Sequence, residues 1–295
     1  MRTAHFFNLA PLLAIFCQLA ISTSTEASAP ARTLSGVLKE ARTLTAQGIE
    51  PVIVMDLDET TVNSIPRRFA SLQVALRDAC SSSSDGAAVS VANQLDENLP
   101  SHGRDCDALK TLTYDDLNHQ QNRYDFSESL RHRGIEPSAW TADLEKAMVA
   151  EYLSGRHIEL DTEVVGAAKY IKRLHEASAK TVYVSSRFSD VQGTATEKSL
   201  ETLRFSQPAN LFELFLRTRG ETSIEFKEKS YGTIKSEVAE SPRKQVVVAV
   251  FENEPENLNA LAQFFPEAAR FFVTGAQLKA AALPSDTNLI ENFRY

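Results

Sequence analysis

The chain has 295 residues, of which 43% are hydrophobic and 24% are charged, an ordinary composition for a globular protein. Its formal net charge of -8 argues against a general nucleic-acid surface, because binding a phosphate backbone requires a basic face. The same acidity does not exclude a small phosphorylated molecule held locally, and the length allows a core domain with an insert.

Residues 1–29 have the pattern of a secretory signal segment. A weakly basic start precedes the apolar run LAPLLAIFCQLAIS, which is too short and too soon followed by polar residues to span a membrane. Small residues suit cleavage after Ala27, and Phe16 before Cys17 argues against a lipid anchor. We therefore expect a secreted or periplasmic protein that keeps no stable membrane anchor after cleavage.

Two cysteines, Cys80 and Cys106, remain once that segment is removed. The compartment is expected to be oxidising, and the polar residues between the two cysteines read as an exposed loop. A disulfide would limit the entropy of such a loop. We predict this bond, and two unpaired thiols are the alternative.

Apolar periodicity predicts a helix over 34–46 and a short buried strand over 52–55. From 66 to 156 the pattern is helical and irregular, with no convincing buried strand, which predicts a helical cap. Beyond it, strands are expected over 181–186, 211–217, 245–252 and 270–274, and helices over 164–178, 194–206, 228–241 and 255–265. This alternation predicts an α/β fold with a doubly wound, mostly parallel sheet, whose core comprises residues 30–65 and 157–295.

Asp56 and Asp58 stand where the first of these strands ends. Ligands of open α/β sheets bind at the carboxyl ends of the strands. Two carboxylates on the same side of a strand repel each other unless a cation or a proton separates them, so the pair indicates a working site. The alternative is a surface turn rich in Asp and Thr.

The later strands end in residues that complement the aspartates. The candidates are Ser185, Ser186, Arg187, Lys227, Lys229, Glu252, Glu254 and Glu256. If they meet at one edge of the sheet, they form a site for an anion, a cation and an attacking oxygen.

These residues resemble the four motifs of the haloacid dehalogenase superfamily. The motif DLDET, the hydroxyl after the second core strand, the later lysine, and the acidic pair at a four-residue offset have the same order and spacing. The stretch LDTEVVGAAKYIKRLHEASAKTVYVSSR, the GT at 193–194 and the FK before a helix are similar to the secreted acid-phosphatase-like branch. The resemblance covers roughly 50–63 and 158–275 and is absent from the cap.

The resemblance implies that Asp56 is a nucleophile that forms an aspartyl phosphate, and that Asp58 is the general acid and base. Mg²⁺ would be held by the carboxylates of Asp56 and Glu252 and by the backbone carbonyl of Asp58. The family's usual aspartates are replaced at the fourth motif by Glu252 and Glu256, each one methylene longer. Glu256 is therefore either a metal ligand or a residue that orients a water. The stretch ENEPEN also suits a solvated helix start.

Ser185 would donate a hydrogen bond to a phosphoryl oxygen, and Lys227 would balance the charge on the transferring group. Lys227 is preferred to Lys229 because Ile234 follows it at the spacing of the phosphatase branch. Further candidates for binding the phosphoryl group are Thr60, Ser186, Arg187 and Lys229. Thr60 could instead orient the motif loop, and Arg187 could instead pair with a neighbouring acid.

The sequence thus predicts a Mg²⁺-dependent phosphomonoesterase that acts on a small phosphorylated substrate. A non-catalytic secreted binding or storage protein on the same fold, and a phosphotransferase, remain alternatives.

Overall fold

The computed structural model describes residues 33–81, 102–117, 126–275 and 281–295. The signal segment predicted for residues 1–29, Cys17 included, lies outside this part of the chain. Within the described ranges, no helix is both long enough and apolar enough to cross a bilayer.

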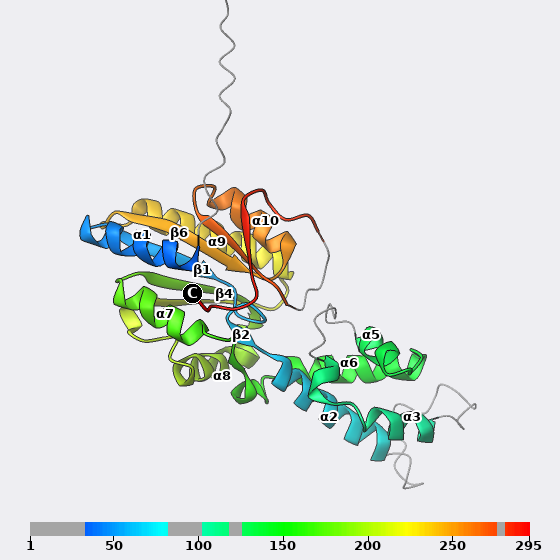
Figure 1. Cartoon of the computed structure of the whole chain (residues 1–295). Coiled ribbons are helices and arrows are strands. Elements are labelled where there is room, and N and C mark those ends of the chain that lie inside the picture. Colours follow the sequence, from blue (N-terminus) through cyan, green and yellow to red (C-terminus); the bar gives the residue numbers. More distant parts are fainter. Residues whose placement is uncertain (1–32, 82–101, 118–125, 276–280) are drawn as a thin grey trace, which may run out of the picture. The chain divides into compact units, whose positions relative to one another are not determined.

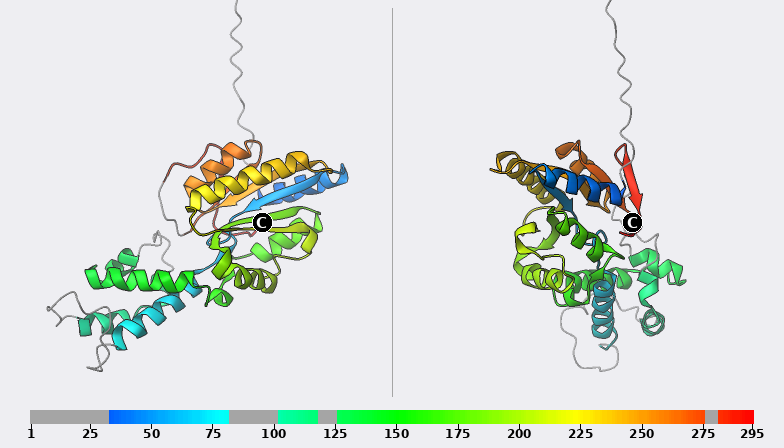
Figure 2. Two further views of the ribbon diagram at one scale, coloured as in Figure 1. Left: turned by 180° about the vertical axis from the view of Figure 1, so that it is seen from behind. Right: turned by 60° about the vertical axis from the view of Figure 1, so that its left-hand side comes forward.

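A six-stranded sheet in the order β5-β4-β1-β6-β7-β8 forms the centre of the fold, and all neighbouring strands are parallel. Its strands are β1 Glu50–Met55, β4 Lys180–Phe188, β5 Phe212–Arg217, β6 Gln245–Glu252, β7 Ala269–Val273 and β8 Thr287–Ile290. In register, Val54 of β1 stands beside Val182 of β4 and Val250 of β6. Figure 1 shows β1 between β4 and β6, and Figure 2 shows β8, in red, at an edge of the sheet. The predicted α/β fold is confirmed, and β8 is an additional strand that was not predicted.

Helices cover both faces of the sheet. The central strand β1 is apolar on both faces, and each face packs against helices. Ile53 and Met55 pack in one cluster with residues of α1 Leu34–Ala46, α7 Ala167–Glu176 and α8 Ser189–Thr202. Val52 and Val54 pack in a second cluster with α9 Ser223–Glu240 and α10 Pro255–Phe264. A strand buried on both faces is expected to read as a continuous apolar run, as this one does.

The chain leaves the core after β2 Val62–Asn63 and returns at β3 Thr162–Glu163, and these two short strands pair antiparallel. Between them lie the cap helices α2 Ile65–Ser81, α3 His102–Leu109, α4 Tyr114–Leu117, α5 Phe126–His132 and α6 Ala139–Leu153. Leu72, Leu109, Leu130 and Leu144 lie in an apolar cluster that joins these helices, which are grouped together in Figure 1. Single turns of 3₁₀ helix occur at Ile158–Leu160 and Ala209–Leu211.

Cys80 at the end of α2 and Cys106 in α3 form a disulfide, as predicted, with 2.12 Å between their sulfur atoms. The residues between these two helices lie outside the described part of the chain.

His175 in the last turn of α7 is buried against two polar groups. Its Nδ1 atom lies 2.6 Å from the carbonyl oxygen of Gln207, to which it must donate, and its Nε2 atom lies 2.9 Å from the hydroxyl of Thr181. Burial lowers the pKa of this imidazole, so the folded chain favours its neutral form.

Candidate active site

The site lies where the order of the strands reverses. After β1 the chain passes through the cap to β4 and β5 on one side of β1, and then returns to β6, β7 and β8 on the other side. Such a reversal opens a crevice at the carboxyl ends of the strands. A cavity of about 630 Å³ occurs there and is lined by most of the predicted residues. They are Asp56, Asp58, Ser185, Ser186, Arg187, Lys227, Glu252, Glu254 and Glu256.

A tight turn delivers the two aspartates to this cavity. The backbone NH groups of Thr60, Thr61 and Val62 all donate to the carbonyl oxygen of Leu57, at 2.8 to 3.1 Å. Glu59 adopts a left-handed conformation with φ of 60°. The motif is therefore a compact turn that leaves β1 and enters β2.

Thr60 is fully buried within this turn and fixes Asp56. Its hydroxyl lies 3.1 Å from Oδ2 of Asp56 and 3.0 Å from the side-chain oxygen of Asn253. The neighbouring Thr61 hydroxyl donates to the backbone carbonyl of Asp56. Thr60 is not among the residues that line the cavity, so the structure supports its orienting role and gives it no contact with the space that a ligand would occupy.

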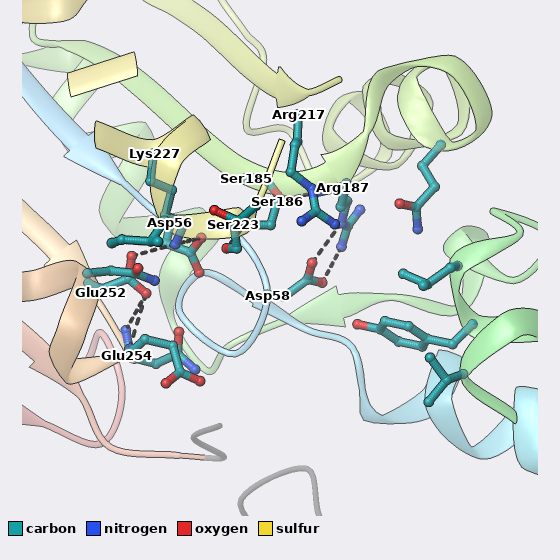
Figure 3. Close-up of a pocket in the computed structure, with 18 of the residues that line it drawn as sticks. Asp56, Asp58, Ser185, Ser186, Arg187, Arg217, Ser223, Lys227, Glu252 and Glu254 are labelled. Carbon is teal, nitrogen blue, oxygen red and sulfur yellow. Dashed lines mark hydrogen bonds and ion pairs between the residues drawn. The ribbon is translucent and has the colours of Figure 1, made fainter. Parts of the chain in front are cut away.

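Asp56 and Glu252 share one buried ammonium group. Nζ of Lys227 lies 2.8 Å from Oδ1 of Asp56 and 2.7 Å from Oε2 of Glu252, as Figure 3 shows. All three side chains are almost wholly buried. Burial and the charge of Glu252 raise the pKa of Asp56 to about 7, although Lys227 opposes that shift. These three side chains thus contain two carboxylates and one ammonium group.

Helix α9 brings Lys227 to this position because it starts at Ser223, five residues earlier than predicted. Thr222 and Glu225 form a capping box at its start. This motif is visible in the sequence, but the prediction of a helix over 228–241 did not take it into account. Both lysines therefore lie within the helix, where positions two apart diverge by about 200°. Lys229 is exposed and pairs with Glu221 at 2.9 Å, so the structure brings Lys227 to the cavity and leaves Lys229 outside it.

Asp58 is held by two arginines, and Figure 3 shows the contact with Arg187, which lines the cavity. Arg187 donates to both of its carboxylate oxygens, at 2.6 and 3.0 Å, and Arg67 of α2 donates at 2.6 Å. Burial alone would raise the pKa of Asp58, but the two guanidinium groups outweigh it and keep that pKa well below its usual range. Asp58 is therefore ionised at neutral pH in this arrangement, and it has no proton to donate.

A second carboxylate completes this arginine cluster. Asp161 lies 2.7 Å from Nη2 of Arg187 and 3.2 Å from Nε of Arg67. The ring of Tyr152, from cap helix α6, lies 4.1 Å from the guanidinium carbon of Arg67, and its hydroxyl accepts a bond from the same residue at 2.7 Å. Of the two roles considered for Arg187, the structure shows pairing with neighbouring acids.

Ser185 and Ser186, both in the second half of β4, line the cavity. Ser185 is buried, and its hydroxyl oxygen lies 3.4 Å from the backbone nitrogen of Arg187. The hydroxyl of Ser186 is hydrogen-bonded to that of Ser223, the first residue of α9.

Several residues that shape the site were not predicted: Arg67, Tyr152, Asp161, Arg217 and Asn253. Arg67 and Tyr152 belong to the cap, where no motif marked them. Asp161 lies inside the stretch LDTEVV that carried the family resemblance, and it was not singled out there.

The predicted metal ligands are the carboxylates of Asp56 and Glu252, the backbone carbonyl of Asp58 and, as one of its two roles, Glu256. Asp56 and Glu252 converge, the carboxylate of Asp58 is turned to its arginines, and Glu256 lines the same cavity from the first turn of α10. Among the described residues, no group of three or more His, Cys, Asp or Glu side chains is arranged to hold a metal. Two buried carboxylates with one ammonium nevertheless leave surplus negative charge, and one or two carboxylates are what Mg²⁺ takes from a protein.

No family model and no curated protein matches this sequence. Among solved structures, the chain is similar to a predicted phosphoglycolate phosphatase from Haemophilus somnus, with 12% identity over 82% of this chain and 94% of that one and a TM-score of 0.43. It is also similar to a haloacid dehalogenase-like family hydrolase from Xanthomonas campestris, with 11% identity, coverage of 83% and 92%, and a TM-score of 0.39. A third similar structure is Protein Tyrosine Kinase A from Mycobacterium tuberculosis, with 17% identity, coverage of 77% and 85%, and a TM-score of 0.42.

Proposed function

We propose that this chain is a Mg²⁺-dependent phosphomonoesterase of the haloacid dehalogenase superfamily, acting on a small phosphorylated substrate. The observation that carries the proposal is the placement of Asp56. Its carboxylate borders a cavity at the topological switch point, fixed by Thr60 and paired with Lys227. A buried, oriented carboxylate beside a cation is suited to attack an anionic phosphoryl group.

In the first step, an Asp56 oxygen bonds to phosphorus while the bond from phosphorus to the ester oxygen breaks, which gives an aspartyl phosphate and an alcohol. Water then attacks the phosphorus, the Asp56 oxygen leaves as a carboxylate, and inorganic phosphate is released. Thr60 favours the reaction by restricting the carboxylate to one orientation, which removes an entropic part of the barrier.

Lys227 and Ser185 supply the charge and the hydrogen bond that the transferring group needs. The Lys227 ammonium is already desolvated and held by Asp56 and Glu252, so little reorganisation is required when charge develops on the phosphoryl oxygens. The Ser185 hydroxyl, buried within β4, can rotate toward a phosphoryl oxygen, since its one hydrogen bond among the described residues is a long contact of 3.4 Å.

Asp56 and Glu252 are the residues that would hold Mg²⁺, which would neutralise the phosphoryl oxygens as a Lewis acid. Their surplus negative charge fits a divalent cation, as the raised pKa of Asp56 also indicates.

Asp58 needs a change of partners before it can act as the general acid. Its two arginines keep it ionised in the present arrangement. Guanidinium groups also bind phosphate oxygens, so an incoming phosphomonoester competes with Asp58 for Arg187, which lines the cavity. We propose that substrate entry releases Asp58 in this way and lets it take up the proton that the leaving oxygen requires.

We also propose that the protein is secreted or periplasmic. The support is the signal pattern in residues 1–29 together with the disulfide between Cys80 and Cys106, since disulfides persist in oxidising compartments.

The test is an assay of purified mature protein against a panel of phosphomonoesters, with Mg²⁺ and with EDTA. We expect Mg²⁺-dependent release of inorganic phosphate and its loss in Asp56→Asn, which removes the nucleophile's charge with little change in shape. Transfer of phosphate to an added alcohol would mark a phosphotransferase. Full activity of a correctly folded Asp56→Asn protein would rule out the covalent mechanism, and binding without turnover of any ester would favour a binding protein.

A further inference from the structure

Apolar side chains contribute part of the cavity lining. Met148, Val149 and Leu153 come from cap helix α6, and Ile224 comes from the first turn of α9. This lining suits the body of an organic substrate better than it suits water. Two cations that the proposed reaction does not use, Arg68 of α2 and Arg217 of β5, also line the cavity.

Arg217 is the last residue of β5, and its side chain points into the cavity in Figure 3. Its guanidinium carbon lies 4.3 Å from the centre of the Phe188 ring, so one face of the group is covered. The Nε atom is buried and has no hydrogen-bond partner, and no ion pair reaches this guanidinium from the other described residues.

The acid that stands near Arg217 in sequence is already engaged. Glu221 accepts bonds from Lys229 at 2.9 Å and from the hydroxyl of Thr218 at 2.7 Å. Arg67 and Arg187 differ from Arg217 in this respect, because they have Asp58 and Asp161 as partners.

A charged group that is half-buried without a partner is unfavourable, and an anion from a ligand would remove that penalty. A guanidinium whose plane is fixed on an aromatic ring offers its edge as a fork, which fits the two oxygens of a carboxylate or of a phosphate. Burial lowers the pKa of Arg217, and the charge of Glu221 opposes that shift without overcoming it.

We propose that Arg217 binds a second anionic group of the substrate. This inference rests on the proposed phosphatase function and narrows it to phosphomonoesters that carry a carboxylate or a further phosphate, separated from the reacting phosphate by an apolar segment. The apolar residues of α6 and α9 would cover that segment. Arg217 is then a specificity-determining residue that stays apart from the reacting atoms.

The test uses esters whose second group is varied at constant length. One arm is a series of ω-phosphooxy alkanoates with one to five methylene groups, each matched with its uncharged amide, and the other arm is the corresponding α,ω-bisphosphates. Affinities are measured by titration calorimetry in Asp56→Asn protein, which cannot turn the esters over by the proposed route. The same measurements are made with Arg217→Gln or Arg219→Gln added.

Arg219 is the matched control. It is the same residue type two positions further on, 5.5 Å from the same ring, but it is exposed, pairs with Asp190 and does not line the cavity. We expect the best carboxylate or bisphosphate to bind about 10- to 100-fold more tightly than its amide, the range for hydrogen bonds to a charged group. Arg217→Gln should abolish that preference, and Arg219→Gln should keep it. The series, carboxylate or bisphosphate, whose affinity falls more on Arg217→Gln identifies the preferred second group of the substrate.

Equal affinity for anionic esters and amides at every chain length, or a preference that survives Arg217→Gln, would overturn the inference. Arg217→Lys serves as a second variant, because it keeps the charge and loses the fork. A failure of the proposed function looks different: wild-type protein would turn over no ester, whatever Asp56→Asn binds.

Discussion

Replacing Lys227 by methionine should destabilise the protein strongly, because it removes the one cation that two buried carboxylates share. Nζ of Lys227 lies 2.8 Å from Asp56 and 2.7 Å from Glu252. Breaking a buried pair costs about 3–5 kcal/mol. Asp56, with a pKa already near 7, can take up a proton and relieve part of this cost, so we expect about 3 kcal/mol near neutral pH.

The matched control is Lys229→Met. That side chain is 74% exposed and pairs with Glu221, and exposed pairs contribute about 0–1 kcal/mol. In thermal unfolding, Lys227→Met should lower the midpoint by roughly 6–12 °C, at about 2–4 °C for each kcal/mol in a chain of this size. Turnover should fall about 10²- to 10³-fold, the effect of losing one preorganised donor, and Lys229→Met should stay close to wild type in both measurements.

A double variant separates the charge effect from simple loss of packing. Adding Glu252→Gln to Lys227→Met removes one of the two uncompensated carboxylates, so it should restore part of the lost stability, although Glu252→Gln alone destabilises. A Lys227→Met protein as stable as wild type, or a double variant whose losses simply add, would refute this account of the site.

Three further predictions follow from other parts of the structure. Arg187→Gln should lower the free energy of unfolding by about 3 kcal/mol in urea titrations, because Asp58 loses the donor that contacts both of its oxygens; a loss under about 1 kcal/mol would contradict that. Replacing Cys80 and Cys106 by serine should lower the free energy of unfolding by about 2–4 kcal/mol. Hydrogen exchange should accelerate more in α3 than in β1, and equal acceleration in both would show that the disulfide does not act locally. His175 has a pKa lowered by burial, so the unfolded chain binds its proton more readily, and the contribution of this residue to stability is lost as pH falls below its unfolded pKa of about 6.5. His175→Gln should therefore flatten the fall in unfolding midpoint between pH 7.5 and 5, and an unchanged slope would count against it.

The sheet could be predicted where local pattern and tertiary role agree. The run Val52 to Met55 is apolar on every residue because the strand is covered on both faces, and helix α1 matches its predicted bounds of 34–46. Helices α8 and α9 start five residues earlier than predicted, at Ser189 and Ser223, and the start of α9 is marked by the capping box of Thr222 and Glu225, which apolar periodicity does not detect. Strand β8 has only four residues, none of them fully buried, so it lacks the apolar run by which the others were found.

The candidate site could be predicted only where each strand end contributes its own motif. Asp56, Ser185, Lys227 and Glu252 were identified in this way, and they line one cavity. The arginine cluster could be predicted only in part. Arg187 was a candidate, with pairing to a neighbouring acid as one of its two roles, whereas Arg67 and Asp161 belong to other segments that only folding brings to the cluster. Its electrostatic effect on Asp58 is likewise a property of the fold and not of the motif.

The pairing of β2 with β3 means that the chain enters and leaves the cap at adjacent points. Asn63 stands opposite Thr162 in an antiparallel pair, the geometry at the closed end of a hairpin. A two-residue Asn-Gly turn could in principle replace everything between them without moving β1 or β4. An insertion joined in this way can lengthen, shorten or be exchanged during evolution while the six-stranded sheet folds as before. Substrate preference can therefore diversify in the cap while the chemistry at Asp56 is retained.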